Sequence, residues 1–96
     1  MKRLNKKKLL YIKDELINSM TSNGVKDSIS SLLHRLESGR TDAKYVNNRI
    51  AYYIRMGYSE IKDFDMLGNI YDRKVYYLNN ELSDEYEDKI QNTYSW

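Results

Sequence analysis

Apolar residues recur at every third or fourth position along most of this chain, which is the spacing of one face of an α-helix. The clearest case is the segment 25–37, whose apolar side chains fall within about a third of the helix circumference. They are Val25, Ile29, Leu32, Leu33 and Leu36. A half-buried strand would instead alternate apolar and polar residues, and the chain contains no proline to interrupt a helix. The spacing therefore predicts a helical protein.

Comparable spacing predicts further helices over residues 3–20 and 41–56, separated from the segment 25–37 by Ser22-Asn23-Gly24 and by Gly39. Thr41 is the predicted N-cap of the third helix, with Asp42 in its first turn. Gly57 ends that helix, Ser59 is expected to cap a fourth, and a last helix is expected over residues 84–93.

The segment 60–82 allows two interpretations. Its apolar residues are spaced by three or four throughout, which predicts one long helix. Gly68-Asn69 interrupts the pattern, however, and the β-branched and aromatic residues that follow favour a strand, so a β-hairpin at 69–78 is the alternative. The 96 residues predict a single domain, 1–96, with an all-α fold of four to five short helices in an irregular bundle. An α+β fold with one hairpin near 69–78 is the alternative.

The residues that most often perform catalysis or bind metals are scarce. There is no cysteine, and the lone histidine, His34, lies opposite the apolar stripe of its helix. The segment 63–70 is similar to the first half of a calcium-binding loop, but Lys74 occupies the position that needs a bidentate glutamate. Phosphate-binding glycine loops are absent as well. We therefore expect no enzyme activity, no cofactor and no metal.

No segment approaches the roughly 20 apolar residues that span a bilayer, and the apolar stretch near the N-terminus is too short for a signal peptide. We therefore expect a cytoplasmic protein without a membrane partner.

Charge is divided between the two parts of the chain. Residues 1–56 contain 12 basic and 5 acidic side chains, a net charge of +7, whereas residues 57–96 contain 4 basic and 9 acidic ones, a net charge of −5. The overall charge of +2 conceals this division. A dipolar molecule of this kind can be steered towards a charged partner by either end.

Nine of the ten tyrosines follow residue 44, too many phenols for a small core to satisfy with hydrogen bonds. Tyr53 and Tyr71 lie on apolar stripes and are expected in the core. Several of the others must be partly exposed, and exposed tyrosine is typical of protein interfaces. These others are Tyr45, Tyr52, Tyr58, Tyr76, Tyr77, Tyr86 and Tyr94.

Most of these tyrosines accompany the acidic part of the chain, which favours a protein partner over a nucleic acid. We therefore expect a non-enzymatic interaction protein that docks on a basic nucleic-acid-binding site of a larger protein. Inhibitors made by phages and other mobile elements, including anti-CRISPR proteins, often have this size and lack of motifs. The predicted partner-binding residues are Asp72, Tyr76, Tyr77, Glu81, Asp84, Glu85, Tyr86, Glu87 and Asp88.

Two alternatives use other features of the chain. The basic N-terminal part could bind nucleic acid, since arginine pairs with phosphate and tyrosine stacks on bases; a helix-turn-helix over 25–56 is a weaker form of this idea. The residues of this alternative are Lys6, Lys7, Lys8, Lys44, Tyr45, Arg49, Tyr52 and Arg55. The chain could also form a homo-oligomer by pairing its oppositely charged ends.

Overall fold

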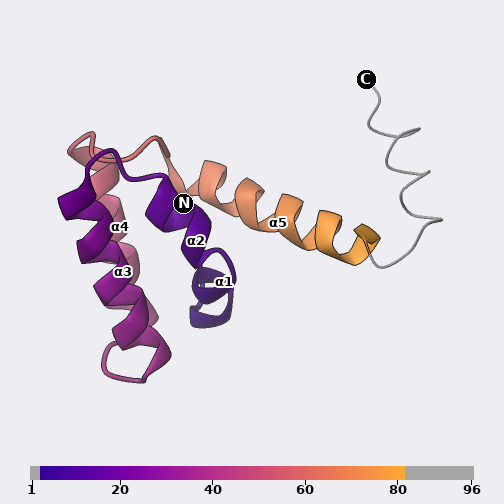
Figure 1. The fold of residues 1–96 in the computed structure, drawn as a ribbon, viewed down its shortest axis with the longest axis horizontal. Helices are drawn as coiled ribbons and strands as arrows, with labels where there is room; N and C mark the ends of the chain where they lie inside the picture. Colours follow the sequence, from indigo (N-terminus) through magenta and orange to yellow (C-terminus); the bar gives the residue numbers. More distant parts are fainter. Residues whose placement is uncertain (1–2, 82–96) are drawn as a thin grey trace.

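The computed structural model describes residues 3–81, with side chains described as far as residue 78. Within that range the chain forms five α-helices and no strand, which confirms the predicted all-α bundle (Figure 1). The helices are α1 (Lys6–Tyr11), α2 (Lys13–Asn18), α3 (Asn23–Glu37), α4 (Ala43–Arg55) and α5 (Phe64–Glu81). The predicted helix over 84–93 lies outside the described residues.

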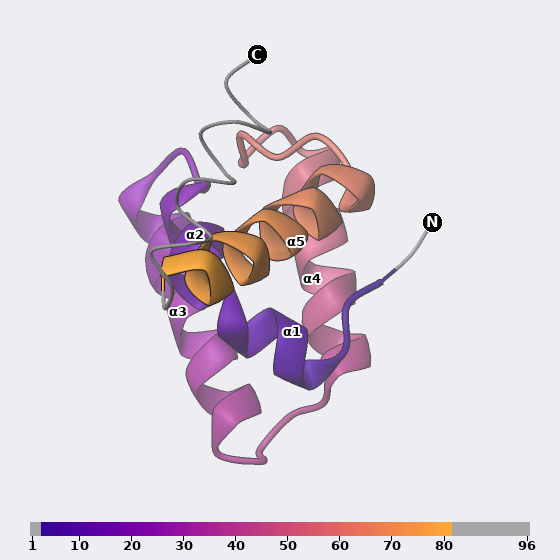
Figure 2. The same ribbon diagram turned by 90° about the vertical axis from the view of Figure 1, so that its right-hand side faces the viewer.

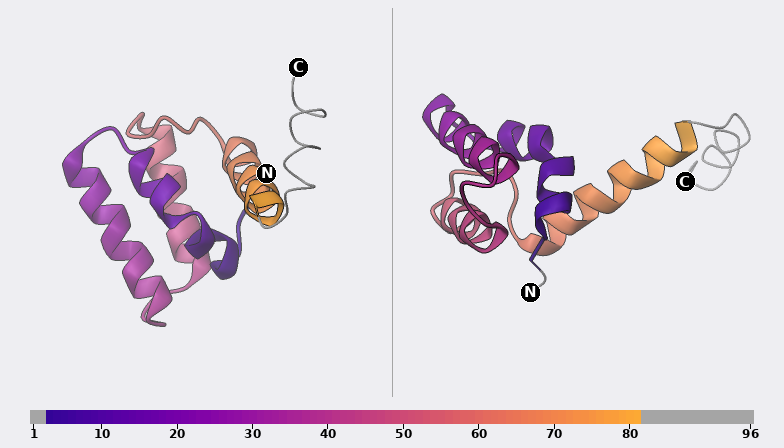
Figure 3. Two further views of the ribbon diagram at one scale, coloured as in Figure 1. Left: turned by 45° about the vertical axis from the view of Figure 1, so that its right-hand side comes forward. Right: turned by 90° about the horizontal axis from the view of Figure 1, so that it is seen from below.

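Helices α3 and α4 lie side by side and antiparallel (Figure 3). Gly39 follows the last turn of α3 with a φ of +79°, a left-handed conformation that favours glycine. The predicted cap of α4 is wrong by one residue: Asp42, not Thr41, is the N-cap, and its carboxylate accepts the Tyr45 N–H at 2.8 Å. The pair is an antiparallel hairpin, whereas a helix-turn-helix crosses its two helices at roughly 90–120°.

The predicted helix over residues 3–20 is bent into α1 and α2 at Ile12. The Ile12 N–H still donates to the Lys8 carbonyl at 3.2 Å, and its own carbonyl accepts the Leu16 N–H at 2.9 Å. Hydrogen bonding thus continues through the bend, although the φ of −109° and ψ of 24° at Ile12 are not helical. Ile12 and Leu16 are both fully buried, so the bend keeps one apolar stripe in the core.

Ser59 does not cap a helix, contrary to the prediction. Residues 19–21 and 58–60 instead form a short antiparallel bridge, in which the Glu60 N–H donates to the Ser19 carbonyl at 2.7 Å. The Ser59 hydroxyl is buried, lies 3.2 Å from that of Ser19 and accepts the Ile61 N–H. Asp63 caps α5 four residues later, where its carboxylate accepts the Met66 N–H at 2.8 Å.

The alternative hairpin at 69–78 is also wrong, because these residues lie inside α5. Gly68 has a negative φ and is an ordinary helical residue. Helix α5 starts beside α1 and extends away from the other four helices, pointing towards the viewer in Figure 2. The apolar residues at its start anchor it, since Phe64 and Leu67 are both buried.

The core lies between α1, α2, α3, α4 and the first turns of α5. Burial of its side chains stabilises the fold by roughly 25 cal/mol for each Å² of apolar surface removed from water. Asn47 is a buried polar residue on the apolar stripe of α4, and its side-chain amide bonds both the N–H and the carbonyl of Leu4. Fully buried core side chains include Leu9, Ile12, Leu16, Ile29, Leu36, Val46, Ile50 and Leu67.

Candidate binding surfaces

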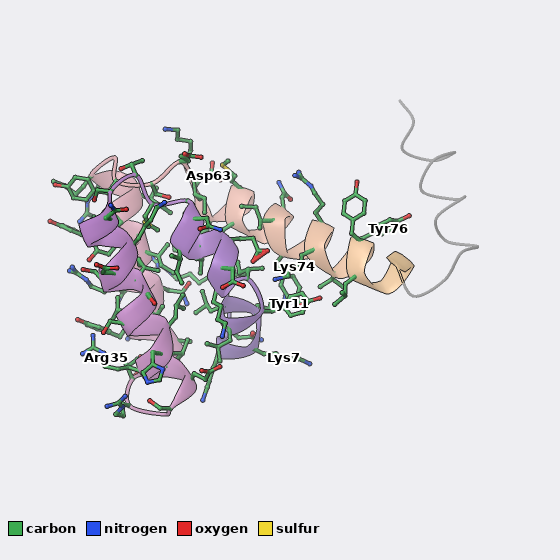
Figure 4. The ribbon with its side chains drawn as sticks, in the orientation of Figure 1. Lys7, Tyr11, Arg35, Asp63, Lys74 and Tyr76 are labelled. Atoms are coloured by element: carbon green, nitrogen blue, oxygen red, sulfur yellow. The ribbon has the colours of Figure 1, made fainter. Side chains whose placement is uncertain are left out.

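Lys74 anchors the middle of α5 to the body of the protein. Its ammonium group donates to the Tyr11 carbonyl at 2.8 Å and to the Glu15 carboxylate at 3.1 Å. It also lies 5.0 Å from the centre of the Tyr11 ring, which meets the Tyr71 ring edge-on at 5.6 Å. Figure 4 shows Lys74 turned towards Tyr11 on α1. These contacts fix α5 against α1 and α2 over its first half.

Beyond Lys74, the other helices no longer cover the apolar stripe of α5. Leu67 is fully buried, Tyr71 is half-buried, and Leu78 is 45% exposed. Leu78 lies only about 20° from Leu67 around the helix, so the two belong to one stripe. The exposure therefore rises because the helix extends past the body (Figure 3). We call residues 75–81 the α5 arm.

Two of the three predicted partner-binding tyrosines, Tyr76 and Tyr77, lie on the α5 arm. Tyr77 is 40% exposed and Tyr76 is half-buried, and their rings meet edge-on at 5.9 Å. Tyr76 lies on the opposite side of the helix from Leu67 and extends away from Tyr11 in Figure 4. Exposed Asp72 is one turn before Tyr76 on the same face. The arm thus presents Tyr76 on the face that it shares with Asp72, and exposes Tyr77 and Leu78 away from that face.

The net negative charge of residues 57–96 lies mostly at and after Glu81. Glu81 ends α5, and the other predicted contact residues, Asp84, Glu85, Tyr86, Glu87 and Asp88, lie outside the described residues. Residues 81–96 contain five acidic and one basic side chain, a net charge of −4, whereas residues 1–80 contain 15 basic and 9 acidic ones, a net charge of +6. Residues 81–96 therefore account for −4 of the net charge of −5 on residues 57–96.

The two parts of the chain are not separate faces within the body. Lys74 pairs with Glu15 across the division, and the Arg3 guanidinium lies 4.8 Å above the Phe64 ring. A hollow of about 310 Å³ between the N-terminal segment and α5 is lined by Arg3 and by Asp72, among others. Opposite charges thus meet along the seam between α1 and α5.

On α4, the residues predicted to bind nucleic acid form a strip in which tyrosine rings alternate with arginine guanidinium groups. Tyr45 is 50% exposed, and Arg49 lies 4.8 Å from the centre of the Tyr52 ring and 5.2 Å from that of Tyr53. Arg55 lies 5.8 Å from the Tyr52 ring. The Tyr53 hydroxyl accepts a hydrogen bond from Arg49 at 3.3 Å, which raises the pKa of the guanidinium above its ordinary value. Lys44, also on this helix, is exposed.

Helix α3 adds a residue to this strip that the sequence did not single out. A hollow of about 400 Å³ between α3 and α4 is lined by Arg35 as well as by Arg49, Tyr45, Ser28 and Ser31. Arg35 and Arg49 are 14 positions apart, and only the antiparallel packing of the two helices brings them to one hollow. The helical spacing of α3 and the predicted turn at Gly39 were the signals that could have indicated it.

The lysines of α1 do not join this hollow. Lys7 extends from α1 on the side of the molecule opposite to that from which Arg35 extends (Figure 4). Lys6 and Lys7 are exposed, whereas Lys8 is half-buried and its ammonium group lies 5.1 Å from the centre of the Tyr71 ring. The residues of the nucleic-acid alternative therefore form two groups on different sides of the body.

No family model, curated protein or solved structure matches this chain. Within residues 3–81, no three histidine, aspartate or glutamate side chains gather where they could hold a metal ion, and His34 is exposed. No helix in that range is both long enough and apolar enough to cross a membrane.

Proposed function

We propose that this protein is a non-enzymatic binding protein that uses the α5 arm to dock on a basic surface of a larger protein. The change in exposure along one stripe, from fully buried Leu67 to Leu78 at 45%, carries the proposal. An amphipathic helix whose apolar stripe continues past its own core is the form in which helices enter grooves on partner proteins. Tyr77, beside Leu78, supplies the kind of aromatic side chain that anchors such interfaces.

Charge indicates what kind of partner fits. Residues 81–96, with their net charge of −4, begin at the last residue of the arm, so acidic residues lie close to Leu78 in sequence. Complementary potentials accelerate encounter and disfavour like-charged partners. A positively charged surface that normally holds nucleic-acid phosphates is the natural match. The proposal therefore includes inhibition of a nucleic-acid-handling enzyme, in the manner of an anti-CRISPR protein from a phage or another mobile element.

The test begins with capture from a low-GC bacterial host at moderate salt and continues with the purified partner. Biolayer interferometry then compares the wild type with Leu78→Ser, which shortens the exposed side chain of the arm. We expect Leu78→Ser to weaken binding about tenfold, equivalent to about 1.4 kcal/mol. Met56→Ser is the matched control, because Met56 is 49% exposed at the end of α4 and should leave binding within about twofold.

Competition establishes where on the partner the protein binds. A nucleic acid bound by the partner should displace this protein from it, since both would occupy the basic surface. The proposal fails if no protein is retained, if the two variants bind equally well, or if nucleic acid and this protein bind the partner together. It also fails if the purified protein is a dimer that Leu78→Ser dissociates, because the arm would then pair with a second copy.

A further inference from the structure

The hollow between α3 and α4 lies on a different part of the molecule from the α5 arm, and its chemistry is different. Two guanidinium groups, of Arg35 and Arg49, line it together with the hydroxyls of Ser28 and Ser31 and the ring of Tyr45. Its volume of about 400 Å³ is that of a small ligand site. We infer that this hollow binds single-stranded nucleic acid, with a phosphate at the two arginines and a base stacked on Tyr45.

Arg49 is held in place before any ligand arrives. Its guanidinium donates to the Tyr53 hydroxyl and lies against the rings of Tyr52 and Tyr53. A guanidinium has five N–H donors in a planar fork, so this bond leaves others for a phosphate. Within the described part of the chain, neither Arg49 nor Arg35 forms an ion pair with a carboxylate. Their charge is therefore available to an anionic ligand.

The position of Asp27 orients the ligand. This carboxylate also lines the hollow, and it precedes Arg35 by eight residues on α3, about 12 Å along the helix axis. A phosphate is repelled from the Asp27 end and attracted to the end where Arg35 lies. The hydroxyls of Ser28 and Ser31 lie on the α3 side of the hollow, between the two charged residues in sequence, where they can donate to phosphate or sugar oxygens.

Tyr45 distinguishes single strands from duplexes. Its ring is half exposed, and an exposed ring stacks on a base only when that base is not already stacked within a double helix. The residues of this site line a hollow between two antiparallel helices, whereas a recognition helix must enter the major groove to read a duplex. Tyr52 and Arg55 continue the strip of rings and guanidinium groups along α4.

Fluorescence anisotropy of a labelled oligothymidylate about ten nucleotides long tests this inference. Replacing both arginines, Arg35→Gln with Arg49→Gln, should weaken binding about tenfold or more. Arg35→Gln alone should weaken it about threefold and leaves the core untouched, because Arg35 is exposed. Lys6→Gln with Lys7→Gln is the matched control: it removes the same charge from the far side of the body and should weaken binding less than about twofold.

Two further measurements probe the geometry. Tyr45→Leu should weaken binding about fivefold, because it removes the stacking surface but no charge. The logarithm of the binding constant should fall with the logarithm of salt concentration with a slope of about −0.7 or steeper, the value for one phosphate contact on a single strand, and the double arginine variant should reduce that slope. Leu78→Ser should leave oligonucleotide binding unchanged, which separates this inference from the proposed docking of the α5 arm.

Three results would overturn the inference. An equal loss of affinity in the arginine and lysine double variants would mean that only net charge matters. Tighter binding to a duplex of the same sequence would exclude stacking on Tyr45. An absence of binding at about 100 μM protein in about 50 mM NaCl, where phosphate contacts are strongest, would exclude the site altogether.

Discussion

Removing the Lys74 ammonium group should loosen α5 from the rest of the fold. Lys74→Met keeps most of the aliphatic side chain but deletes the hydrogen bonds to the Tyr11 carbonyl and the Glu15 carboxylate. The Tyr11 carbonyl and the Glu15 carboxylate are left without this partner, and the stacking of the ammonium on the Tyr11 ring is also lost. We therefore expect a lower free energy of unfolding.

The magnitude follows from how exposed the contact is. A hydrogen bond to a charged group contributes about 1.5–3 kcal/mol when it is protected from water, whereas an exposed ion pair contributes about 0.2–1 kcal/mol. The Lys74 and Glu15 side chains are 33% and 34% exposed, which places this contact between the two limits. We expect Lys74→Met to lower the free energy of unfolding by about 1–2 kcal/mol.

Urea denaturation followed by circular dichroism measures this loss, since urea is uncharged and does not screen the ion pair. Arg73→Met is the matched control: Arg73 is the exposed neighbour of Lys74 on the same helix and should change stability by less than about 0.5 kcal/mol. A double-mutant cycle with Glu15→Gln should give a coupling energy of about 0.5–1 kcal/mol. Equal stability of the Lys74 and Arg73 variants, or an absence of coupling, would refute the reasoning.

Further substitutions test other parts of the fold by the same denaturation assay. Leu36→Ala empties a fully buried position of α3 and should destabilise the protein by about 3 kcal/mol. Asn47→Ala leaves the N–H and carbonyl of Leu4 without their partner and should destabilise it by about 2 kcal/mol, with faster amide exchange at Leu4. Gly57 has a φ of +80°, which strains any residue with a Cβ atom, so Gly57→Ala should lower the free energy of unfolding by about 1 kcal/mol. Gly68 is a helical residue with open space at its Cβ position, so Gly68→Ala should raise it by about 0.5–1 kcal/mol. Loss of stability in Gly68→Ala, or a gain in Gly57→Ala, would contradict this argument.

The sequence predicted a helix correctly where a continuous apolar face is followed by a residue that ends helices. Helix α3 has such a face, and Gly39 ends it in the left-handed conformation that its position predicted. In α5, the spacing of three and four was the better guide than the strand-forming residues around Tyr76. Spacing is decisive there because Leu67 and the other early stripe residues pack on the body, and tertiary packing overrides intrinsic preference.

Predictions of helix caps were wrong where a side chain could form hydrogen bonds either near its own position or with residues distant in sequence. Ser59 has the residue type of an N-cap, but its hydroxyl bonds the Ile61 N–H and lies next to Ser19, 40 residues away in sequence. Thr41 and Asp42 are both good caps, and only the observed backbone shows that Asp42 is used. Leu78 continues the apolar stripe but is 45% exposed, because spacing does not reveal where the other helices stop covering α5.

The two candidate surfaces lie on different sides of a chain whose net charge is only +2. The α5 arm leaves the body on the side opposite α3, whose arginine lines the other hollow (Figure 1). Lys74 lies between them and pairs with Glu15, so the positive charge of Lys74 is already neutralised within the protein. The α5 arm and the arginines of the α3–α4 hollow thus lie on either side of this contact. A short oligonucleotide in the hollow should therefore leave the arm free to bind its partner, whereas a nucleic acid that occupies the basic surface of the partner should exclude the arm from it.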